Sequence, residues 1–186
     1  MRGAIQPRRV TLCGRTSSLS RGERKTERDA NDSALDYRKA QPRLITKWPS
    51  VPIEFAPIAA HVVLTALREL GSPDPRVRES GMAKAGPLKT DQDFFIIDAP
   101  FKTLLTAGDV KAGKAKGDGT DGLWEVSQLA ARIKAITGVL EVGLFYGYDG
   151  VEAAELGIRG AGQKPIAVYF GMEDGSVKVR TKKGES

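Results

Sequence analysis

Hydrophobic and polar positions follow a regular pattern from residue 51 onward. In VPIEFAP (51–57), the apolar side chains of Val51, Ile53 and Phe55 alternate with proline and glutamate. A period of two is typical of a strand that buries one of its faces. Pro57 interrupts the alternation, so we predict that the strand ends there.

The next stretch, residues 58–70, repeats apolar residues at spacings of three and four. Its apolar positions are Ile58, Ala59, Val62, Val63, Ala66, Leu67 and Leu70. At 3.6 residues per turn these positions form one wide stripe, which predicts a helix of about three to four turns. Gly71 follows as a C-terminal cap, and the Ser-Pro-Asp-Pro run after it predicts a turn.

Three further apolar stretches continue the pattern. Val77 is predicted to lie in a short strand, and FFIIDAPF (94–101) is predicted to be a largely buried strand. A second helix is predicted from the apolar positions Leu123, Val126, Leu129, Ala130, Ile133 and Ile136. Gly138 is expected to end this helix, and residues 139–145 form the next predicted strand.

The predicted order over residues 51–145 is strand, helix, strand, strand, helix, strand. This is the split βαβ order of a ferredoxin-like domain, in which two helices cover one face of an antiparallel sheet. The Gly-rich polar stretches 108–122 and 149–165 are predicted loops. An Asp-Gly turn between residues 167–170 and 176–179 predicts a β-hairpin. The fold class is therefore α+β.

The first 35 residues show neither a helical nor a strand period, which favours a disordered or loosely attached tail. They contain eight Lys or Arg and four Asp or Glu, a net charge of +4 in a chain of 186 residues with +6 overall. The other 151 residues thus carry only +2. The basic character belongs to the tail, and it indicates solubility or weak association rather than a fold.

Cysteine usage and hydropathy narrow the class of protein further. Cys13 is the only cysteine, which excludes an intramolecular disulfide and fits a reducing compartment. Its polar, Arg-rich surroundings favour a free thiol over a nucleophile. No apolar run is long enough to span a bilayer, so no membrane partner is expected.

Glycine-rich runs and the single histidine are the residues that could carry chemistry. GDGTDG (117–122) and GIRGAGQK (157–164) lack a preceding strand and a following helix, so both are predicted loops rather than phosphate sites. In SGMAKAGP and the residues after it, Lys84 and Lys89 flank a turn and could meet a phosphate, although a basic surface turn is the simpler interpretation. His61 is predicted to be a partly exposed structural residue.

Metal and nucleic-acid sites find little support in the sequence. No cluster has metal-ligand spacing, so neither a metal nor another cofactor is expected. Tyr37 and Trp48, interleaved with Lys39, Arg43 and Lys47, could stack on bases. However, the predicted sheet carries no paired aromatic platform, so nucleic-acid binding is not expected.

Four segments in the same order as in a known family give the strongest functional signal. They are DYRKAQPRLITKWPSVPIEFAP, KAGPLKTDQDFFIIDAPF, GVLEVGLF and YFGMEDGSVKVR. From about residue 34 to 180, the chain resembles the A-type ribose-5-phosphate isomerases, especially the fungal form, with a departure at Gln92-Asp93 where relatives have Asn-rich residues. The resemblance implies the C-terminal portion of an enzyme that interconverts ribose 5-phosphate and ribulose 5-phosphate in the non-oxidative pentose phosphate pathway, without a metal.

In that family a Rossmann-like N-terminal domain holds the active site, and a ferredoxin-like domain is inserted near its end. A Glu carboxylate moves the proton between two carbons, assisted by Asp and Lys. Three motifs serve these roles: a Gly-Ser-Thr phosphate loop, an Asp-Gly-Ala-Asp segment, and a Lys-Gly-Gly-Gly run before the Glu. None of the three occurs in this sequence. The resemblance therefore implies that the Rossmann-like domain is largely missing and that no catalytic residue is present.

Lys39 is the one site residue that the resemblance carries over. It matches the family's substrate-contacting lysine after an Ala-Asp pair, although Leu35 intrudes before Asp36. Without the resemblance, a solvated lysine would be the simpler interpretation.

The expected organisation follows from the pattern and the resemblance together. We expect a tail (1–35), an interdomain junction (36–50), a ferredoxin-like domain (51–145), returning C-terminal strands (146–182) that in the family join the Rossmann-like sheet, and a second tail (183–186). The first tail resembles a mitochondrial transit peptide. We favour the alternative that it is an aberrant start that replaces a lost N-terminal half. The expected location of the protein is then the cytoplasm.

Two functional hypotheses remain open from the sequence. The first is a truncated isomerase with little or no activity alone, whose last strands expose unpaired edges. The second is a non-catalytic ferredoxin-like module for oligomerisation or interaction. Expected partners are a sugar phosphate, further copies of the chain, or a full-length isomerase.

Overall fold

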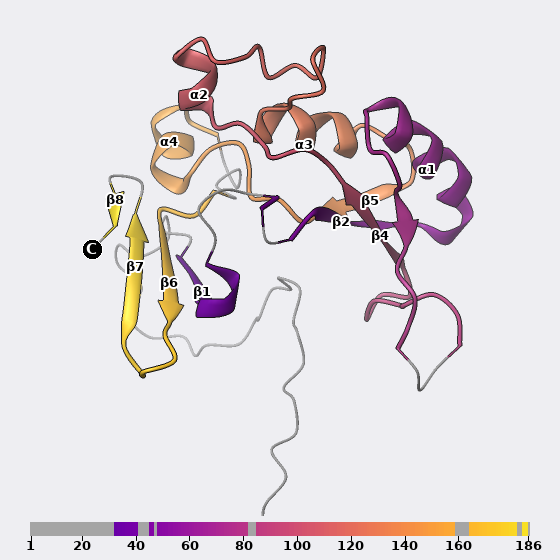
Figure 1. Cartoon of the computed structure of the whole chain (residues 1–186), viewed down its shortest axis with the longest axis horizontal. Coiled ribbons are helices and arrows are strands. Elements are labelled where there is room, and N and C mark those ends of the chain that lie inside the picture. The colour runs from indigo at the N-terminus through magenta and orange to yellow at the C-terminus, as the bar shows by residue number, and fades with distance from the viewer. Residues whose placement is uncertain are drawn as a thin grey trace, which may run out of the picture.

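The computed structural model contains two four-stranded sheets flanked by helices (Figure 1). It describes residues 32–40, 45–46, 48–81, 85–158, 164–181 and 184–185. The predicted tail over residues 1–31, with Cys13, lies outside the described residues.

The first sheet, which we call the β2–β5 sheet, has the strand order β3-β4-β2-β5 with every neighbouring pair antiparallel. Its strands are β2 (Ser50–Phe55), β3 (Arg76–Val77), β4 (Phe95–Pro100) and β5 (Val139–Val142). Helix α1 (Ala60–Glu69) joins β2 to β3, and helix α3 (Val126–Lys134) precedes β5. Chain order and strand order are thus those of the predicted split βαβ arrangement.

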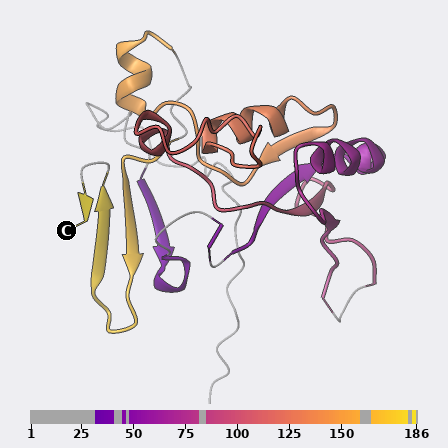
Figure 2. The ribbon, with the colours of Figure 1, turned by 45° about the horizontal axis from the view of Figure 1, so that its top comes forward.

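The hydrophobic core lies between this sheet and its two helices. Val51, Ile53 and Phe55 of β2 are fully buried, as their alternation predicts. Leu67 of α1 and Ile133 of α3 belong to the same buried cluster. Both helices lie on one side of the sheet (Figure 2). This part of the molecule therefore has a closed core of its own.

The apolar stripe of α1 is narrower than its sequence suggests. Val63 and Leu67 of α1 are buried, whereas Val62 of the same helix is 54% exposed. Ile58 is 98% exposed and lies in the 3₁₀ helix η2 (Pro57–Ala59) that precedes α1. Two adjacent rows of apolar residues compete for the buried face, and a helix can direct only one row at the sheet. The prediction that Ile58 and Val62 lie on the buried face is wrong.

Glycines end both helices as predicted. Gly71 has φ +93°, and the N–H of Ser72 donates to the carbonyl of Leu67 at 3.0 Å, which closes a Schellman motif. Gly138 also has a positive φ, and a Cβ there would lie 2.2 Å from the Cβ of Ala59. Glycine is therefore required at residue 138 both for its backbone angle and for close packing.

Two short helices occupy stretches predicted to be loops. Helix α2 (Ala107–Lys111) overlaps the start of the stretch 108–122, and helix α4 (Gly150–Glu155) lies within 149–165. Each begins with a reciprocal capping box. The pairs are Thr106 with Asp109 and Asp149 with Glu152. These caps satisfy N–H groups that a short helix would otherwise leave unpaired, so composition alone misjudged both stretches.

The second sheet, which we call the β1–β8 sheet, has the strand order β1-β6-β7-β8. Its strands are β1 (Asp32–Asp36), β6 (Ala167–Gly171), β7 (Val177–Thr181) and β8 (Gly184–Glu185). Strands β6 and β7 form the predicted hairpin, while β1 pairs with β6 in parallel. The expectation of tails over residues 1–35 and 183–186 is thus wrong at residues 32–35 and 184–185, which pair into this sheet.

Candidate functional site

The carboxyl end of β1 is the place in the fold where the sequence puts its one predicted site residue. The 3₁₀ helix η1 (Tyr37–Lys39) follows β1 directly and contacts β6. Because β1 and β6 are parallel, their carboxyl ends meet at one edge of the sheet, where Asp36 is paired with Gly171. Ligands of open sheets with parallel strands bind outside this kind of edge.

Lys39 is the last residue of η1, so its backbone lies at this carboxyl edge. The N–H of Ala40 donates to the carbonyl of Tyr37 at 2.9 Å, which closes the 3₁₀ turn. The structure does not describe the side chain of Lys39. Its role as a substrate-binding residue therefore stays a prediction, supported by the place of its backbone.

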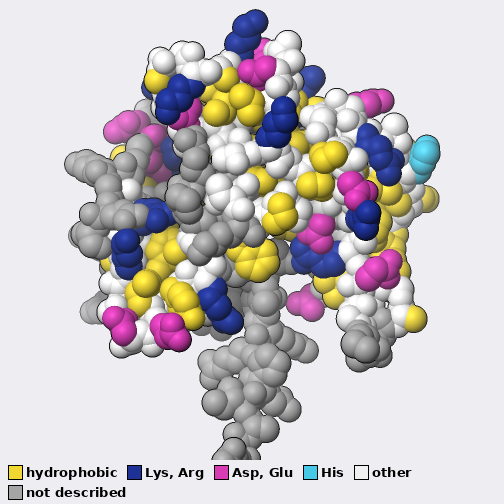
Figure 3. Space-filling model, viewed as in Figure 1, with side chains coloured by type: hydrophobic (Ala, Val, Ile, Leu, Met, Phe, Trp, Pro, Cys, Tyr) yellow, Lys and Arg dark blue, Asp and Glu magenta, His cyan; other side chains and the backbone are white. Residues whose placement is uncertain are grey.

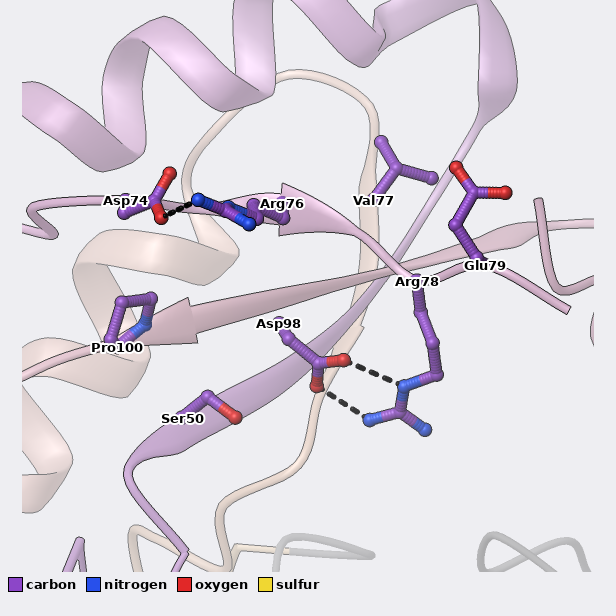
Figure 4. Close-up of a pocket in the computed structure, with 8 residues that line it drawn as sticks. All are labelled: Ser50, Asp74, Arg76, Val77, Arg78, Glu79, Asp98 and Pro100. Carbon is purple, nitrogen blue, oxygen red and sulfur yellow. Dashed lines mark hydrogen bonds and ion pairs between the residues drawn. The ribbon is translucent and has the colours of Figure 1, made fainter. Parts of the chain in front are cut away.

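A second candidate is a shallow groove of about 490 Å³ on the β2–β5 sheet (Figure 4). It is lined by Ser50, Asp74, Arg76, Val77, Arg78, Glu79, Asp98 and Pro100. Arg78 binds Asp98 with two hydrogen bonds, Nε to Oδ2 at 2.8 Å and Nη2 to Oδ1 at 2.5 Å. Arg76 pairs with Asp74 at 2.6 Å. Each of the two guanidinium groups thus faces a carboxylate from within the groove.

These pairs decide which ligands the groove can attract. The hydrogen bonds that Arg78 donates to Asp98 raise the pKa of Arg78, and the hydrogen bond that Arg76 donates to Asp74 raises the pKa of Arg76. The same contact lowers the pKa of Asp74. With three acids beside two arginines, the groove carries no excess of positive charge for a phosphate. The pair of Arg78 with Asp98 instead links the end of β3 to β4.

The sequence analysis missed this groove because its partners are far apart along the chain. Arg78 and Asp98 are separated by 20 positions. The available signal was the alternation of Arg76 and Arg78 around Val77, matched by Asp98 between two buried residues of β4. Alternation places these side chains on the polar face, but only strand pairing brings them together.

Residues 117–122 form a loop, as predicted, and the carboxylates of this loop accept hydrogen bonds from residues within it or directly after it. Asp118 accepts hydrogen bonds from the hydroxyl and the N–H of Thr120, which lower its pKa. Asp121 accepts from the N–H of Leu123 at 3.0 Å. Trp124 lies against Gly119, where a Cβ would come within 2.2 Å of the indole ring. The second run, 157–164, lies mostly outside the described residues.

The remaining candidates from the sequence do not converge on a site. His61 is exposed on α1, as predicted. Lys89 is exposed and lies 3.5 Å from Asp93, whereas Lys84 is outside the described residues. Trp48 is 54% exposed, and Arg43 and Lys47 are not described.

The face of the molecule seen in Figure 3 carries basic and acidic side chains interspersed. Hydrophobic side chains gather on this face over the β1–β8 sheet. Within the described ranges, no group of three or more His, Cys, Asp or Glu could hold a metal ion. No helix in the part of the chain that the structure describes is long and apolar enough to cross a bilayer.

Comparison with known proteins identifies the family. A sequence model of ribose 5-phosphate isomerase A (phosphoriboisomerase A) matches residues 33–155. The chain belongs to the ribose 5-phosphate isomerase A family. The predicted resemblance is thereby confirmed.

Curated relatives and solved structures agree with this assignment. Ribose-5-phosphate isomerases of Mycosarcoma maydis and Schizosaccharomyces pombe are each 38% identical over 151 residues. Each match covers 81% of this chain, but only 41% and 42% of the relatives. The isomerase A structure from Methanocaldococcus jannaschii is similar with a TM-score of 0.54 and 26% identity, over 81% of this chain and 49% of that one. A D-ribose-5-phosphate isomerase in complex with phospho-erythronic acid gives 0.55 and 25%, over 82% and 50%.

The chain therefore spans about half the length, or less, of the proteins it matches. The structure is mixed helix and sheet, with strand pairs that are mostly antiparallel, consistent with the predicted α+β class.

Proposed function

We propose that this chain is a ribose-5-phosphate isomerase family protein that serves the interconversion of ribose 5-phosphate and ribulose 5-phosphate, and that it has little or no activity alone. One observation carries the proposal: the family match covers residues 33–155, while the chain spans only 41% of the Mycosarcoma maydis relative. We assign the expected ferredoxin-like domain to the β2–β5 sheet with its helices, and the expected returning strands to the β1–β8 sheet.

The chemistry explains why we expect low activity. Moving a proton between two adjacent carbons of a sugar requires a base for the carbon-bound proton and donors for the oxyanion that develops. The sequence contains none of the three motifs that the family resemblance assigns to these roles. Loss of a general base alone costs about 10²–10⁴ in rate. The phosphate loop would supply binding as well.

A coupled assay with ribose 5-phosphate tests this proposal. We expect the purified chain to show turnover near the background rate. Turnover close to that of the Schizosaccharomyces pombe relative, measured in parallel, would contradict the proposal. The control is the chain mixed with that relative, which excludes an inhibitor in the preparation.

Lys39 is the residue that we propose for contact with the sugar phosphate. Its backbone lies at the shared carboxyl edge of β1 and β6, where a basic side chain could meet an anionic ligand. Phospho-erythronic acid, which is bound by a structural relative, is a suitable probe.

NMR titration with phospho-erythronic acid measures this contact. We expect weak binding, with shifts at residues 36–40, that Lys39→Met reduces at least threefold. Lys111→Met, which removes an exposed lysine of α2, is the matched control and should leave the titration unchanged. Equal effects of the two substitutions would show that the ligand responds only to overall charge.

A further inference from the structure

The groove on the β2–β5 sheet lies on the face opposite to the two helices (Figure 2). Ser50 is in register with Pro100, and Arg76 is in register with Asp98, so these four side chains share one face. Ala99, between Asp98 and Pro100 in β4, points to the core and is fully buried. The groove thus belongs to the polar face of the sheet, and its side chains come from three neighbouring strands.

The side chains of this groove offer both donors and acceptors of hydrogen bonds. Arg78 binds Asp98 through Nε and Nη2, so its third nitrogen, Nη1, takes no part in this pair. Each carboxylate oxygen of Asp98 can accept more than one hydrogen bond, and the Ser50 hydroxyl can both donate and accept. The side chains of Arg78 and Asp98 are 37% and 31% exposed. A ligand in the groove can therefore reach both members of the pair (Figure 4).

The charges of the groove select against most classes of ligand. Its three acids, Asp74, Glu79 and Asp98, and its two arginines give a net charge of −1. A phosphate would meet three carboxylates, and a metal cation would meet two guanidinium groups. An apolar ligand would take water from these charged groups and return no hydrogen bonds. A neutral molecule with several hydroxyl groups satisfies both signs, because each hydroxyl donates and accepts.

A sugar also carries C–H groups, and the groove offers apolar surface for them. Pro100 is partly exposed beside Ser50, and the methylene stems of Arg76 and Arg78 add to its ring. The volume of about 490 Å³ lies within the range of about 300–1,000 Å³ that is typical of small-molecule sites. We propose that this groove binds a neutral sugar, at a site separate from the one at Lys39. This inference goes beyond the proposed function, since it requires neither turnover nor Lys39.

NMR titration of the full chain with D-ribose tests the proposal. We expect saturable amide shifts at residues 50, 76–79 and 98. Ribose 5-phosphate should bind the groove more weakly than ribose, because its phosphate brings negative charge to a site that already has an excess of acid. Shifts that do not saturate, shifts that are absent from the groove, or tighter binding of ribose 5-phosphate there would each overturn the proposal.

A hydroxyl deletion that spares both ion pairs tests the contact directly. Ser50→Ala should weaken the binding of ribose about threefold to tenfold, the cost of one lost hydrogen bond. Ser127→Ala is the matched control, because Ser127 is also partly exposed but lies in α3, on the opposite side of the sheet. This control should leave the affinity unchanged. Equal affinities of the two variants would contradict binding in the groove.

A change of charge tests the selectivity. The double substitution Asp74→Asn with Glu79→Gln keeps the pair of Arg78 with Asp98 and leaves two arginines beside one acid. The ratio of the affinities for ribose 5-phosphate and ribose at the groove should rise about tenfold. An unchanged ratio would refute the role of charge. These substitutions are remote in sequence from residues 36–40, so failure here counts against the groove and leaves the titration of the proposed isomerase site to decide that function.

Discussion

The two sheets of this protein differ in how completely they are closed. In the β2–β5 sheet both edges are protected: β3 has only two residues and follows Pro73 and Pro75, and the Lys134 ammonium donates to the carbonyl of Leu140 on β5. Its helices complete a core with many fully buried side chains. Among the strand residues of the β1–β8 sheet whose side chains the structure describes, Phe170 is the only one that is buried.

This difference separates stability from function in the fold. The β2–β5 sheet and its helices share one cluster of buried apolar side chains. The carboxyl end of β1 in the β1–β8 sheet leads into η1, which ends at the proposed ligand residue Lys39. Substitutions should therefore act on global stability in the core of the first sheet and on ligand binding in the second.

The largest expected effect comes from the core of the β2–β5 sheet. Leu67→Ala removes a fully buried side chain of α1 and should lower the free energy of unfolding by about 2–5 kcal/mol, measured by urea denaturation. Val62→Ala, on the exposed side of the same helix, should change it by less than about 0.5 kcal/mol. Similar effects at both positions would show that α1 is not docked on the sheet as described.

Close packing between α1 and the end of α3 should give the next effect. Gly138→Ala brings a Cβ to 2.2 Å from that of Ala59 and should cost about 1–3 kcal/mol for overpacking, beyond the strain at positive φ. Gly147→Ala is the control, because Gly147 also has a positive φ but open space around it. The difference between the two variants in urea isolates the contact with Ala59, and equal costs would refute it.

A smaller effect is expected at the polar face of the same sheet. Asp98→Asn breaks the bidentate pair with Arg78 and should cost about 1 kcal/mol, since the two side chains are 31% and 37% exposed and solvent screens their attraction. Asp74→Asn, at the more exposed pair with Arg76, should leave the urea midpoint unchanged. Added salt should reduce the cost of Asp98→Asn, and a cost that is insensitive to salt would contradict an ionic origin.

The smallest effect belongs to the β1–β8 sheet and depends on pH. The hydroxyl and the N–H of Ser176 donate to Asp174 in the turn between β6 and β7, and they lower the pKa of Asp174 below 3.8. Because the folded hairpin prefers the ionised carboxylate, this contribution is present above the ordinary aspartate pKa and is lost as the pH falls through the lowered value.

NMR titration of the Asp174 carboxyl carbon measures this shift. The midpoint should lie below 3.8 and return toward it in Ser176→Ala. The urea midpoint for unfolding of the β2–β5 sheet should be the same in the unaltered chain and in Ser176→Ala throughout this pH range. A midpoint at or above 3.8 in the unaltered chain would contradict the hydrogen bonds of the turn.

By itself, the sequence determined the elements that have a strong local signal. The alternation at Val51, Ile53 and Phe55, the glycine after α1 and the Asp-Gly hairpin turn each predicted an element that the structure contains. These features depend on residues that are close along the chain. The family was also predictable, because four segments kept their order.

Only the tertiary structure decided which of several local possibilities is realised. The sequence does not distinguish which of two neighbouring apolar rows of α1 faces the core. Docking of the helix on the sheet buries Val63 and leaves Val62 exposed. The strand at Asp32–Asp36 has a weak pattern and forms by pairing with β6, more than 130 positions later. The pair of Arg78 and Asp98 likewise requires two neighbouring strands. Burial and strand pairing depend on partners distant in sequence, and a local pattern does not contain them.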